Sequence, residues 1–237
     1  MKACCDLHIH TALSPCGDMD MTPNNIVNMS VLNGLDMIAI TDHNTIGNAA
    51  AVTECAKGKP LIVVPGMELE TAEEAHFVCL FPSLEQAQQF AQWLAPFHAP
   101  IQNRPDIFGE QALMDHTDTI TGYESRMLVT ASTCSVWDAA PAVREIGGII
   151  YPAHVDRDSY SIITNLGTVP SDLAFTAVEF SRHATREGLL SQCPYLTDYR
   201  LITGSDAHYL GDIYENENVL ELDELSVNAL FCYLTGK

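Results

Sequence analysis

The chain alternates between short apolar runs and longer segments in which apolar residues recur at helical spacing. Apolar runs of strand length, bounded by turn residues, predict buried strands. They occupy residues 3–9, 36–41, 61–68, 76–81, 149–152, 177–180 and 200–203. Helical spacing predicts helices over about 46–57, 84–95, 134–146 and 222–234. A further helix is expected to begin at Thr22 and Pro23, which suit the N-cap and the first helical position, and to end at Gly34.

The order of these elements predicts an α/β fold. Strands that alternate with helices through short connections are typical of parallel strands joined by helical crossovers. Six or seven such units in a row favour a closed or nearly closed barrel over an open sheet. His76 is an exception because it begins its strand, so this strand is expected to run antiparallel or to start at the site. One domain over residues 1–237 is expected, with an irregular excursion at about 96–130 that is partly helix and partly loop.

The charge balance is strongly acidic. The 237 residues include 31 acidic and 11 basic ones, which gives a net charge of −20, and 47% of the residues are hydrophobic. A surface with this field repels nucleic-acid backbones, so we expect a small phosphorylated substrate and no long nucleic acid as partner. A charge that only keeps the protein soluble explains the composition equally well.

The eight cysteines do not form a recognisable metal or redox motif, because the sequence contains no Cys-x-x-Cys. Several lie in apolar stretches and are interpreted as small buried side chains. The N-terminal residues lack an apolar signal core, and no apolar run approaches the length that spans a membrane. We therefore expect a cytoplasmic protein without membrane contact.

His8 and His10 close the first predicted strand. Side chains alternate along a strand, so both imidazoles point the same way. Two adjacent imidazoles form half of a metal site, although such pairs also occur by chance. Metal-ligand types follow later strands as well, namely Asp42, His43, Glu68, His154, Asp206 and His208. With His76, six of the nine histidines fall in these positions. The carboxyl ends of parallel strands meet at one edge, so we expect one shared site.

Imidazole and carboxylate donors without cysteine suit zinc, manganese or iron in a hydrolytic centre. More than four ligands imply more than one metal, and adjacent cations need a bridging carboxylate, for which Glu68 is the natural candidate. Paired metals about 3.5–4 Å apart hold the attacking and leaving oxygens of an in-line displacement at phosphorus.

Five segments together resemble a known family. They are His8-Ile9-His10, Thr41-Asp42-His43-Asn44, Gly66-Met67-Glu68, Pro152-Ala153-His154 and Gly204-Ser205-Asp206-Ala207-His208. In this order, over essentially the whole chain, they are similar to the motifs of the polymerase and histidinol phosphatase (PHP) superfamily. The resemblance implies a distorted (β/α)7 barrel with two or three divalent metal ions (Zn, Mn or Fe).

The resemblance also implies which residues hold each metal. His8 and His10 would share one metal with Asp206 and Glu68. Glu68 would bridge to a second metal held by His76 and His154. His43 and His208 would hold the third, with Asp18 as its loop ligand and Asp20 as the alternative. Asp6 and Asp42 precede ligands; they either orient imidazole rings or are simply polar loop residues.

Basic residues near the strand ends are candidates for phosphate contact. Arg157 follows His154 closely and is expected to bind substrate, the alternative being a surface salt bridge. Arg182 and His183 follow the strand over 177–180; Arg182 is a second substrate ligand, and His183 a group that protonates the leaving oxygen. Asp206 or His183 would manage protons in catalysis.

These observations predict a metal-dependent phosphoesterase in which a metal-activated water attacks phosphorus in line. The resemblance allows histidinol phosphate, nucleoside phosphates or the 5′ ends of short oligonucleotides as substrates. Two alternatives remain: a catalytically silent metal-binding regulatory module, and a hydrolase of another bond, such as an amide, on the same metals.

Overall fold

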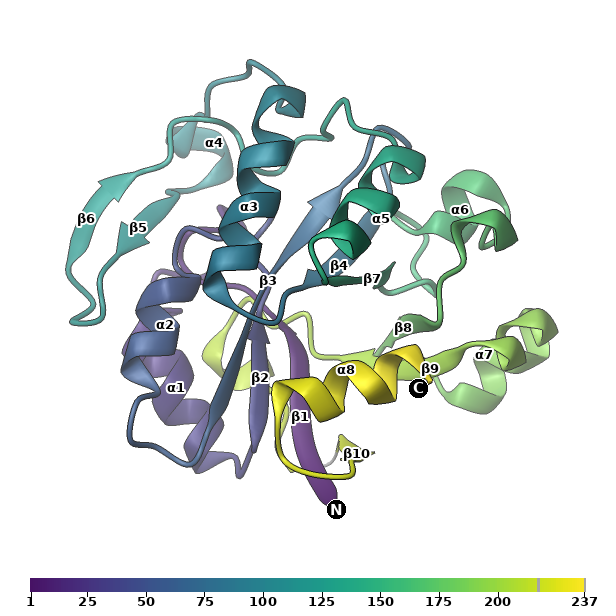
Figure 1. Ribbon diagram of the computed structural model, residues 1–237. Coiled ribbons are helices and arrows are strands. Elements are labelled where there is room, and N and C mark those ends of the chain that lie inside the picture. Colours follow the sequence, from purple (N-terminus) through teal and green to yellow (C-terminus); the bar gives the residue numbers. More distant parts are fainter. Residues whose placement is uncertain (217, 237) are drawn as a thin grey trace.

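The fold is a curled mixed sheet covered by helices, as the computed structural model shows for residues 1–216 and 218–236 (Figure 1). The strand order of the main sheet is β10-β1-β2-β3-β4-β7. Its strands are β10 (Val219–Glu221), β1 (Lys2–Ile9), β2 (Met37–Ile40), β3 (Ile62–Glu70), β4 (His76–Leu80) and β7 (Ile149–Pro152). A separate parallel pair consists of β8 (Ala177–Ser181) and β9 (Arg200–Gly204).

The parallel pair lies between the two ends of the curled sheet. Val155, just after β7, donates its N–H to the carbonyl of Glu179 in β8 over 2.9 Å. On the other side, Ile9 at the end of β1 forms a parallel bridge with Ala207, just after β9. The sheet therefore curls far enough to bring the end of β1 beside the end of β9.

The α/β class is confirmed, but a complete (β/α)7 barrel is not. Strands β1, β2 and β3 run parallel, whereas β4 is antiparallel to both β3 and β7. A tight turn over residues 71–75 joins β3 to β4 in place of a helix. A turn this short can only return the chain antiparallel. The alternative expected for His76, an antiparallel strand, is the one observed.

Helices occupy all five positions that the sequence indicates, although the last begins at 227 and not at 222, and three further short helices among the described residues were not expected at their positions. The helices are α1 (Pro23–Leu32), α2 (Ala49–Cys55), α3 (Leu84–Leu94), α4 (Pro105–Phe108), α5 (Val136–Glu145), α6 (Ile162–Leu166), α7 (Arg186–Gln192) and α8 (Val227–Thr235). Thr22 caps α1 by accepting a hydrogen bond from the Asn25 N–H, as expected. Ser83, Ser135 and Ser226 cap α3, α5 and α8 in the same way.

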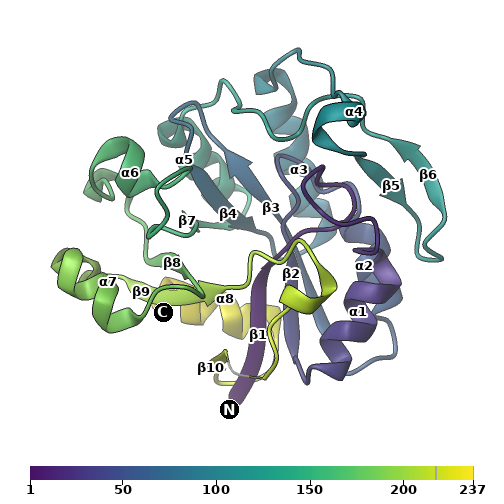
Figure 2. The same ribbon diagram turned by 180° about the vertical axis from the view of Figure 1, so that it is seen from behind.

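The excursion at 96–130 contains a hairpin that was not expected. It pairs β5 (Ala112–Met114) with β6 (Ile120–Tyr123) and lies at one edge of the molecule in both views (Figures 1 and 2). The Asn48 side chain holds it, because its amide donates to the Ala112 carbonyl and its oxygen accepts from the Met114 N–H. Strands of three and four residues are too short to show a period in the sequence.

The core fills both sides of the sheet. One buried cluster contains Phe77, Phe81 and Phe90 together with residues of α5. A second cluster joins Leu7 of β1 and Tyr151 of β7 to Leu230 of α8, the helix that crosses the strands in Figure 1. Among the described residues, no helix combines the length and the apolar character needed to cross a bilayer. The cytoplasmic location stays a prediction.

Candidate metal centre

The strand ends bring six imidazoles and two carboxylates together at one end of the curled sheet. The residues are His8, His10, His43, Glu68, His76, His154, Asp206 and His208. Most of them are buried, and His8 and His10 are fully so. Period-2 alternation along β1 puts His8 and His10 on one face, with ring centroids 5.2 Å apart. The structure thus brings together every predicted metal ligand except one.

Three groups of these residues could each hold a cation. Ligand atoms lie within 4.8 Å of one another in His8, His10, Glu68 and Asp206, in His43, Glu68 and His76, and in His10, His43 and His208. His154 Nε2 lies 3.0 Å from Glu68 Oε1. Glu68 belongs to two of the groups, which is the position a bridging carboxylate occupies.

The exception is Asp18. Its backbone N–H donates to the His208 carbonyl over 2.8 Å, so the loop does pass beside the centre. Its carboxylate, however, accepts the N–H of Asp20 and belongs to none of the three groups. The loop ligand of the third group stays a prediction.

A buried relay fixes the tautomer of His10. The Ser14 hydroxyl donates to Asp42 Oδ1 over 2.8 Å, so its lone pair accepts from His10 Nδ1 at 3.0 Å. With the proton on Nδ1, His10 Nε2 keeps its lone pair for a metal. Asp42 therefore orients the His10 imidazole, which is one of the two roles expected for it. It does so through Ser14, a link that the sequence did not reveal.

Glu179 orients the His8 imidazole in a similar way, and the sequence did not reveal this role. Its Oε1 lies 2.9 Å from His8 Nδ1 and also accepts the His154 N–H at 3.3 Å. The sequence does contain a signal for this role. A carboxylate within the apolar strand 177–180 is expected to be buried, and a buried charge requires a partner. Gly204 makes room for it, since a Cβ there would lie 2.5 Å from Glu179 Oε2 and 2.7 Å from His8 Cβ.

Two of the ligand positions have strained backbone. His154 and Asp206 have φ of 30° and 52°, in the left-handed region that non-glycine residues rarely adopt. Each lies two residues after the end of a strand, β7 for His154 and β9 for Asp206. Strain of this kind is characteristic of functional sites, where the surrounding structure holds it in place.

The cluster maintains ionised carboxylates at neutral pH. Burial raises the pKa of Glu68. The nearby imidazoles of His76, His8 and His43 together lower it by more, so this pKa lies well below its usual range. Burial lowers the pKa of His76, which the nearby Glu68 then raises to about 9. Burial and the neighbouring His10 lower the pKa of His208 to about 3. The centre therefore combines anionic carboxylates with at least one neutral imidazole, as a divalent cation requires.

The side chains fit divalent cations. His8 Nε2, Glu68 Oε2 and His154 Nδ1 are buried and make no hydrogen bond within the described residues. Buried polar atoms are almost always paired, so these point to a missing partner. For His8 Nε2 and Glu68 Oε2, which lie within the groups above, a cation supplies one. The three groups consist of imidazole and carboxylate donors, which are ligands that divalent metal ions take in proteins.

Of the predicted substrate residues, only Arg157 reaches the centre. Its guanidinium lies 2.6 Å from Asp206 Oδ2 and is 40% exposed. Arg182 instead packs over the Tyr214 ring and lines a different cavity with Leu210. His183 is exposed, and neither it nor Arg182 lines the cavity over the metal ligands. Their substrate and catalytic roles stay predictions without support from the geometry.

A cavity of about 500 Å³ opens over the metal ligands. His43, Glu68, His76, His154, Asp206 and His208 form its floor, and Arg157 lies at its edge. Apolar side chains complete its walls, including Phe108, Met127, Val129 and Tyr160. Phe108, Met127 and Val129 belong to the excursion at 96–130, so this segment shapes the cavity.

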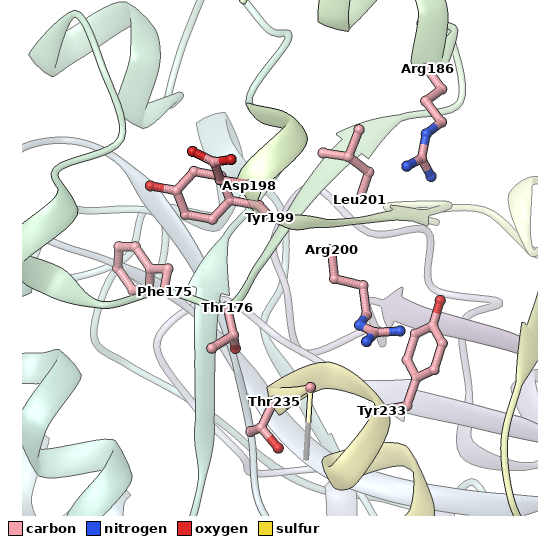
Figure 3. A pocket seen from close by; sticks show the side chains of 10 residues that line it. Phe175, Thr176, Arg186, Asp198, Tyr199, Arg200, Leu201, Tyr233 and Thr235 are labelled. Atoms are coloured by element: carbon pink, nitrogen blue, oxygen red, sulfur yellow. The ribbon is translucent and has the colours of Figure 1, made fainter. Parts of the chain in front are cut away.

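A second cavity, of about 490 Å³, lies at the opposite end of β9. Figure 3 shows Arg186, Arg200 and Tyr233 on one side of it and Phe175 and Tyr199 on the other. Its lining includes one carboxylate, Asp198, and no histidine. Volume alone therefore does not identify the site; the donor set does.

Solved structures share this fold. The lesion-specific endonuclease Q of Pyrococcus furiosus superposes with a TM-score of 0.72 at 17% identity, over all of this chain and 56% of that one. A complex of endonuclease Q with a 27-mer duplex gives 0.73 at 16% identity, over all of this chain and 57% of that one. A protein described as a metal-dependent phosphoesterase, from Bifidobacterium adolescentis, gives 0.64 at 20% identity over 98% of both chains.

Curated relatives are similar over part of the chain. An uncharacterized protein of Methanocaldococcus jannaschii is 38% identical over 81 residues, which is 31% of this chain and 46% of that protein. The 5′-3′ exoribonuclease Rnm of Escherichia coli is 29% identical over 148 residues, 55% of this chain and 50% of that protein. The chain thus spans about half the length, or less, of the curated relatives it matches.

These comparisons overturn one expectation. The prediction of a small phosphorylated substrate with no long nucleic acid as partner is wrong, because endonuclease Q of the same fold holds a DNA duplex and Rnm is an exoribonuclease. The error was to treat the net charge of −20 as a property of the site. Net charge averages over the whole surface, whereas the field in a cavity depends on the groups and ions that line it.

The predicted family is confirmed. Residues 6–136, more than half of the chain, match the PHP domain, and the chain belongs to the PHP domain family.

Proposed function

We propose that this protein is a metal-dependent phosphoesterase that hydrolyses phosphodiester bonds of nucleic acid at a strand end. The observation that carries the proposal is Glu68, which belongs to two ligand groups on the floor of a cavity that Arg157 borders. Two or three divalent ions, Zn, Mn or Fe, would be held by the eight residues at the strand ends. When bound, such ions activate water and neutralise phosphoryl oxygens.

The residues of the chain position the reacting phosphate. Arg157 presents a planar guanidinium that suits two phosphoryl oxygens at once, and its pairing with Asp206 Oδ2 holds it over the floor of the cavity. Burial alone raises the pKa of Asp206, but His8 and His10 lower it well below its usual range. Asp206 therefore stays ionised and accepts hydrogen bonds, so that it orients Arg157 and the attacking water.

A nucleic-acid strand suits the cavity better than a compact phosphate monoester. The cavity combines a polar floor with apolar walls, a combination that recognises a phosphate and an attached base. The relative Rnm, an exoribonuclease, supports action at a strand end. The cavity over the metal ligands thus needs to admit one terminal nucleotide at a time.

The test uses the full chain with added Mn²⁺, Zn²⁺ or Fe²⁺ and RNA and DNA strands labelled at the 3′ end or, in a second set, at the 5′ end. We expect stepwise shortening from one end, and loss of activity by at least about 100-fold in Glu68→Gln because the bridging carboxylate is removed. Glu221→Gln is the matched control, since Glu221 is exposed in β10. Full activity in Glu68→Gln, or no cleavage of any strand with any of the metals, would contradict the proposal.

A further inference from the structure

We propose that Tyr160 and Phe108 form a base-binding subsite, so that the cavity takes a terminal nucleotide whose base has left the helical stack. The proposal rests on the proposed function and adds the substrate class: single strands or frayed ends. Both residues line the cavity over the metal ligands, and both carry large exposed apolar area.

Tyr160 is held rigidly against a metal ligand. Its ring stacks on the His76 ring with centroids 4.6 Å apart and planes 24° apart, and its carbonyl accepts the His76 N–H over 2.8 Å. Although one face is covered in this way, the residue is still 50% exposed. Tyr160 also lines the cavity, so the exposed ring is available there beside the centre.

The backbone of Tyr160 is strained. Its φ of 56° lies in the left-handed region, which a bulky aromatic residue rarely adopts. A glycine or asparagine would adopt this conformation more easily. Strain at an exposed aromatic residue on the rim of a site, where packing alone gains little, is typical of a ligand contact.

Phe108 provides a second aromatic wall from another part of the chain. It ends α4 in the excursion at 96–130 and is 41% exposed. The following residue, Gly109, has φ of 97° and approaches the Pro15 carbonyl too closely for a Cβ. This contact fixes the end of α4 against the loop over 10–21, so Phe108 is presented by an anchored segment.

The chemistry of this arrangement matches a nucleotide. The floor of the cavity attracts phosphate once cations are bound, whereas aromatic faces recognise a base without reading its sequence. Stacking on protein rings requires a base that is free of its neighbours, which a single strand supplies more easily than a duplex. A cavity of about 500 Å³ lies within the size range of small-ligand sites.

The test compares two strands that differ in one base. Binding is measured by fluorescence anisotropy with a single strand whose terminal linkage is a slowly hydrolysed phosphorothioate, and with the same strand carrying an abasic terminal nucleotide. We expect the wild type to bind the complete strand more tightly. In Tyr160→Ala and Phe108→Ala this preference should fall about tenfold or more, the loss typical of a base-stacking residue. Tyr160→Phe should retain it.

Matched controls separate stacking from general damage. Tyr123→Ala and Ile107→Ala remove exposed side chains from the same excursion that do not line the cavity, and should keep the preference. Equal binding of both strands by the wild type would overturn the inference. So would a Tyr160→Ala variant that weakens both strands equally, because Tyr160 would then act only through His76. Binding preference without any hydrolysis would instead count against the proposed function alone.

Discussion

Glu179 Oε1 lies 2.9 Å from His8 Nδ1, and both side chains are buried. The carboxylate thereby keeps the imidazole proton on Nδ1 and leaves Nε2 bare, facing Glu68 and Asp206. Because β8 and β1 are far apart in the sequence, this contact joins the parallel β8–β9 pair to the rest of the sheet. The same carboxylate therefore contacts the metal centre and adds to the contacts that hold the β8–β9 pair beside β1.

Removing the charge of Glu179 should weaken metal binding. In Glu179→Gln the side chain keeps its size, but it no longer fixes the orientation and basicity of His8 as a carboxylate does. Loss of such an outer partner typically lowers metal affinity about 10- to 100-fold. Titration of the metal-free protein with Mn²⁺ or Zn²⁺ by calorimetry measures the change. Glu221→Gln is the control, and equal affinities of wild type and Glu179→Gln would refute the assigned role.

The candidate metal ligands could be found from the sequence because of where they lie. His8, His43, Glu68 and His154 each end or follow an apolar run, and strand ends converge whatever the details of the fold. Period-2 alternation adds that His8 and His10 share a face. Neither inference requires knowledge of long-range packing, which explains why both agree with the structure.

Other features depend on contacts between distant segments and could not be derived locally. The partners Glu179 and Ser14 act through hydrogen bonds that only the folded sheet creates. The β5–β6 hairpin is stabilised by Asn48, a residue more than sixty positions earlier. Arg182 follows its strand closely, as Arg157 does, yet packs over Tyr214 instead of the cavity.

Chelation should lower the thermal stability of the protein. Among the residues that the structure describes, buried His8 Nε2 and Glu68 Oε2 find no hydrogen-bond partner, so a bound cation stabilises the folded state. A ligand present at about 100 times its dissociation constant adds roughly 2.7 kcal/mol, which is about 5–10 °C for a chain of this size. Thermal melts with EDTA and after Mn²⁺ addition test this. The shift should be smaller in Glu68→Gln; an identical melting temperature with and without chelator would contradict the metal assignment.

Arg157 should contribute to transition-state binding. Its guanidinium pairs with Asp206 at 2.6 Å and borders the cavity. A hydrogen bond to a charged group contributes about 1.5–3 kcal/mol, so Arg157→Ala should lower kcat/KM about 10- to 100-fold. Arg157→Lys should recover only part of this loss. It keeps the positive charge, but an ammonium cannot contact two oxygens in one plane. Arg104→Ala, which removes an exposed guanidinium paired with Asp106, should have no effect.

His98 should make stability depend on acid. Burial and the nearby Arg126 lower the pKa of His98 to about 4, below its value of about 6.5 in an unfolded chain. The folded state therefore favours the neutral ring, and its contribution is complete above about pH 6.5 and lost as the pH falls toward 4. Between pH 7 and pH 4.5, the melting temperature of the wild type should fall more than that of His98→Gln, which lacks this titrating group. Replacement of the exposed His116 by Gln is the control, and parallel pH profiles for wild type and His98→Gln would contradict the prediction.

Salt should increase the rate at which the enzyme processes nucleic acid. With 31 acidic and 11 basic residues, the surface repels an approaching phosphate backbone, even though the cations of the cavity attract the terminal phosphate. The Debye length falls from about 30 Å at 10 mM salt to about 8 Å at 150 mM, which screens the distant surface more than the short contacts inside the cavity. We expect kcat/KM for a long strand to rise over this range, while that for bis(p-nitrophenyl) phosphate, with one charge, changes little. Proteins that neutralise many phosphates with basic residues show the opposite trend, because salt competes with their contacts. A steady fall of kcat/KM with salt would mean that a basic surface, and not the cavity, provides most of the binding.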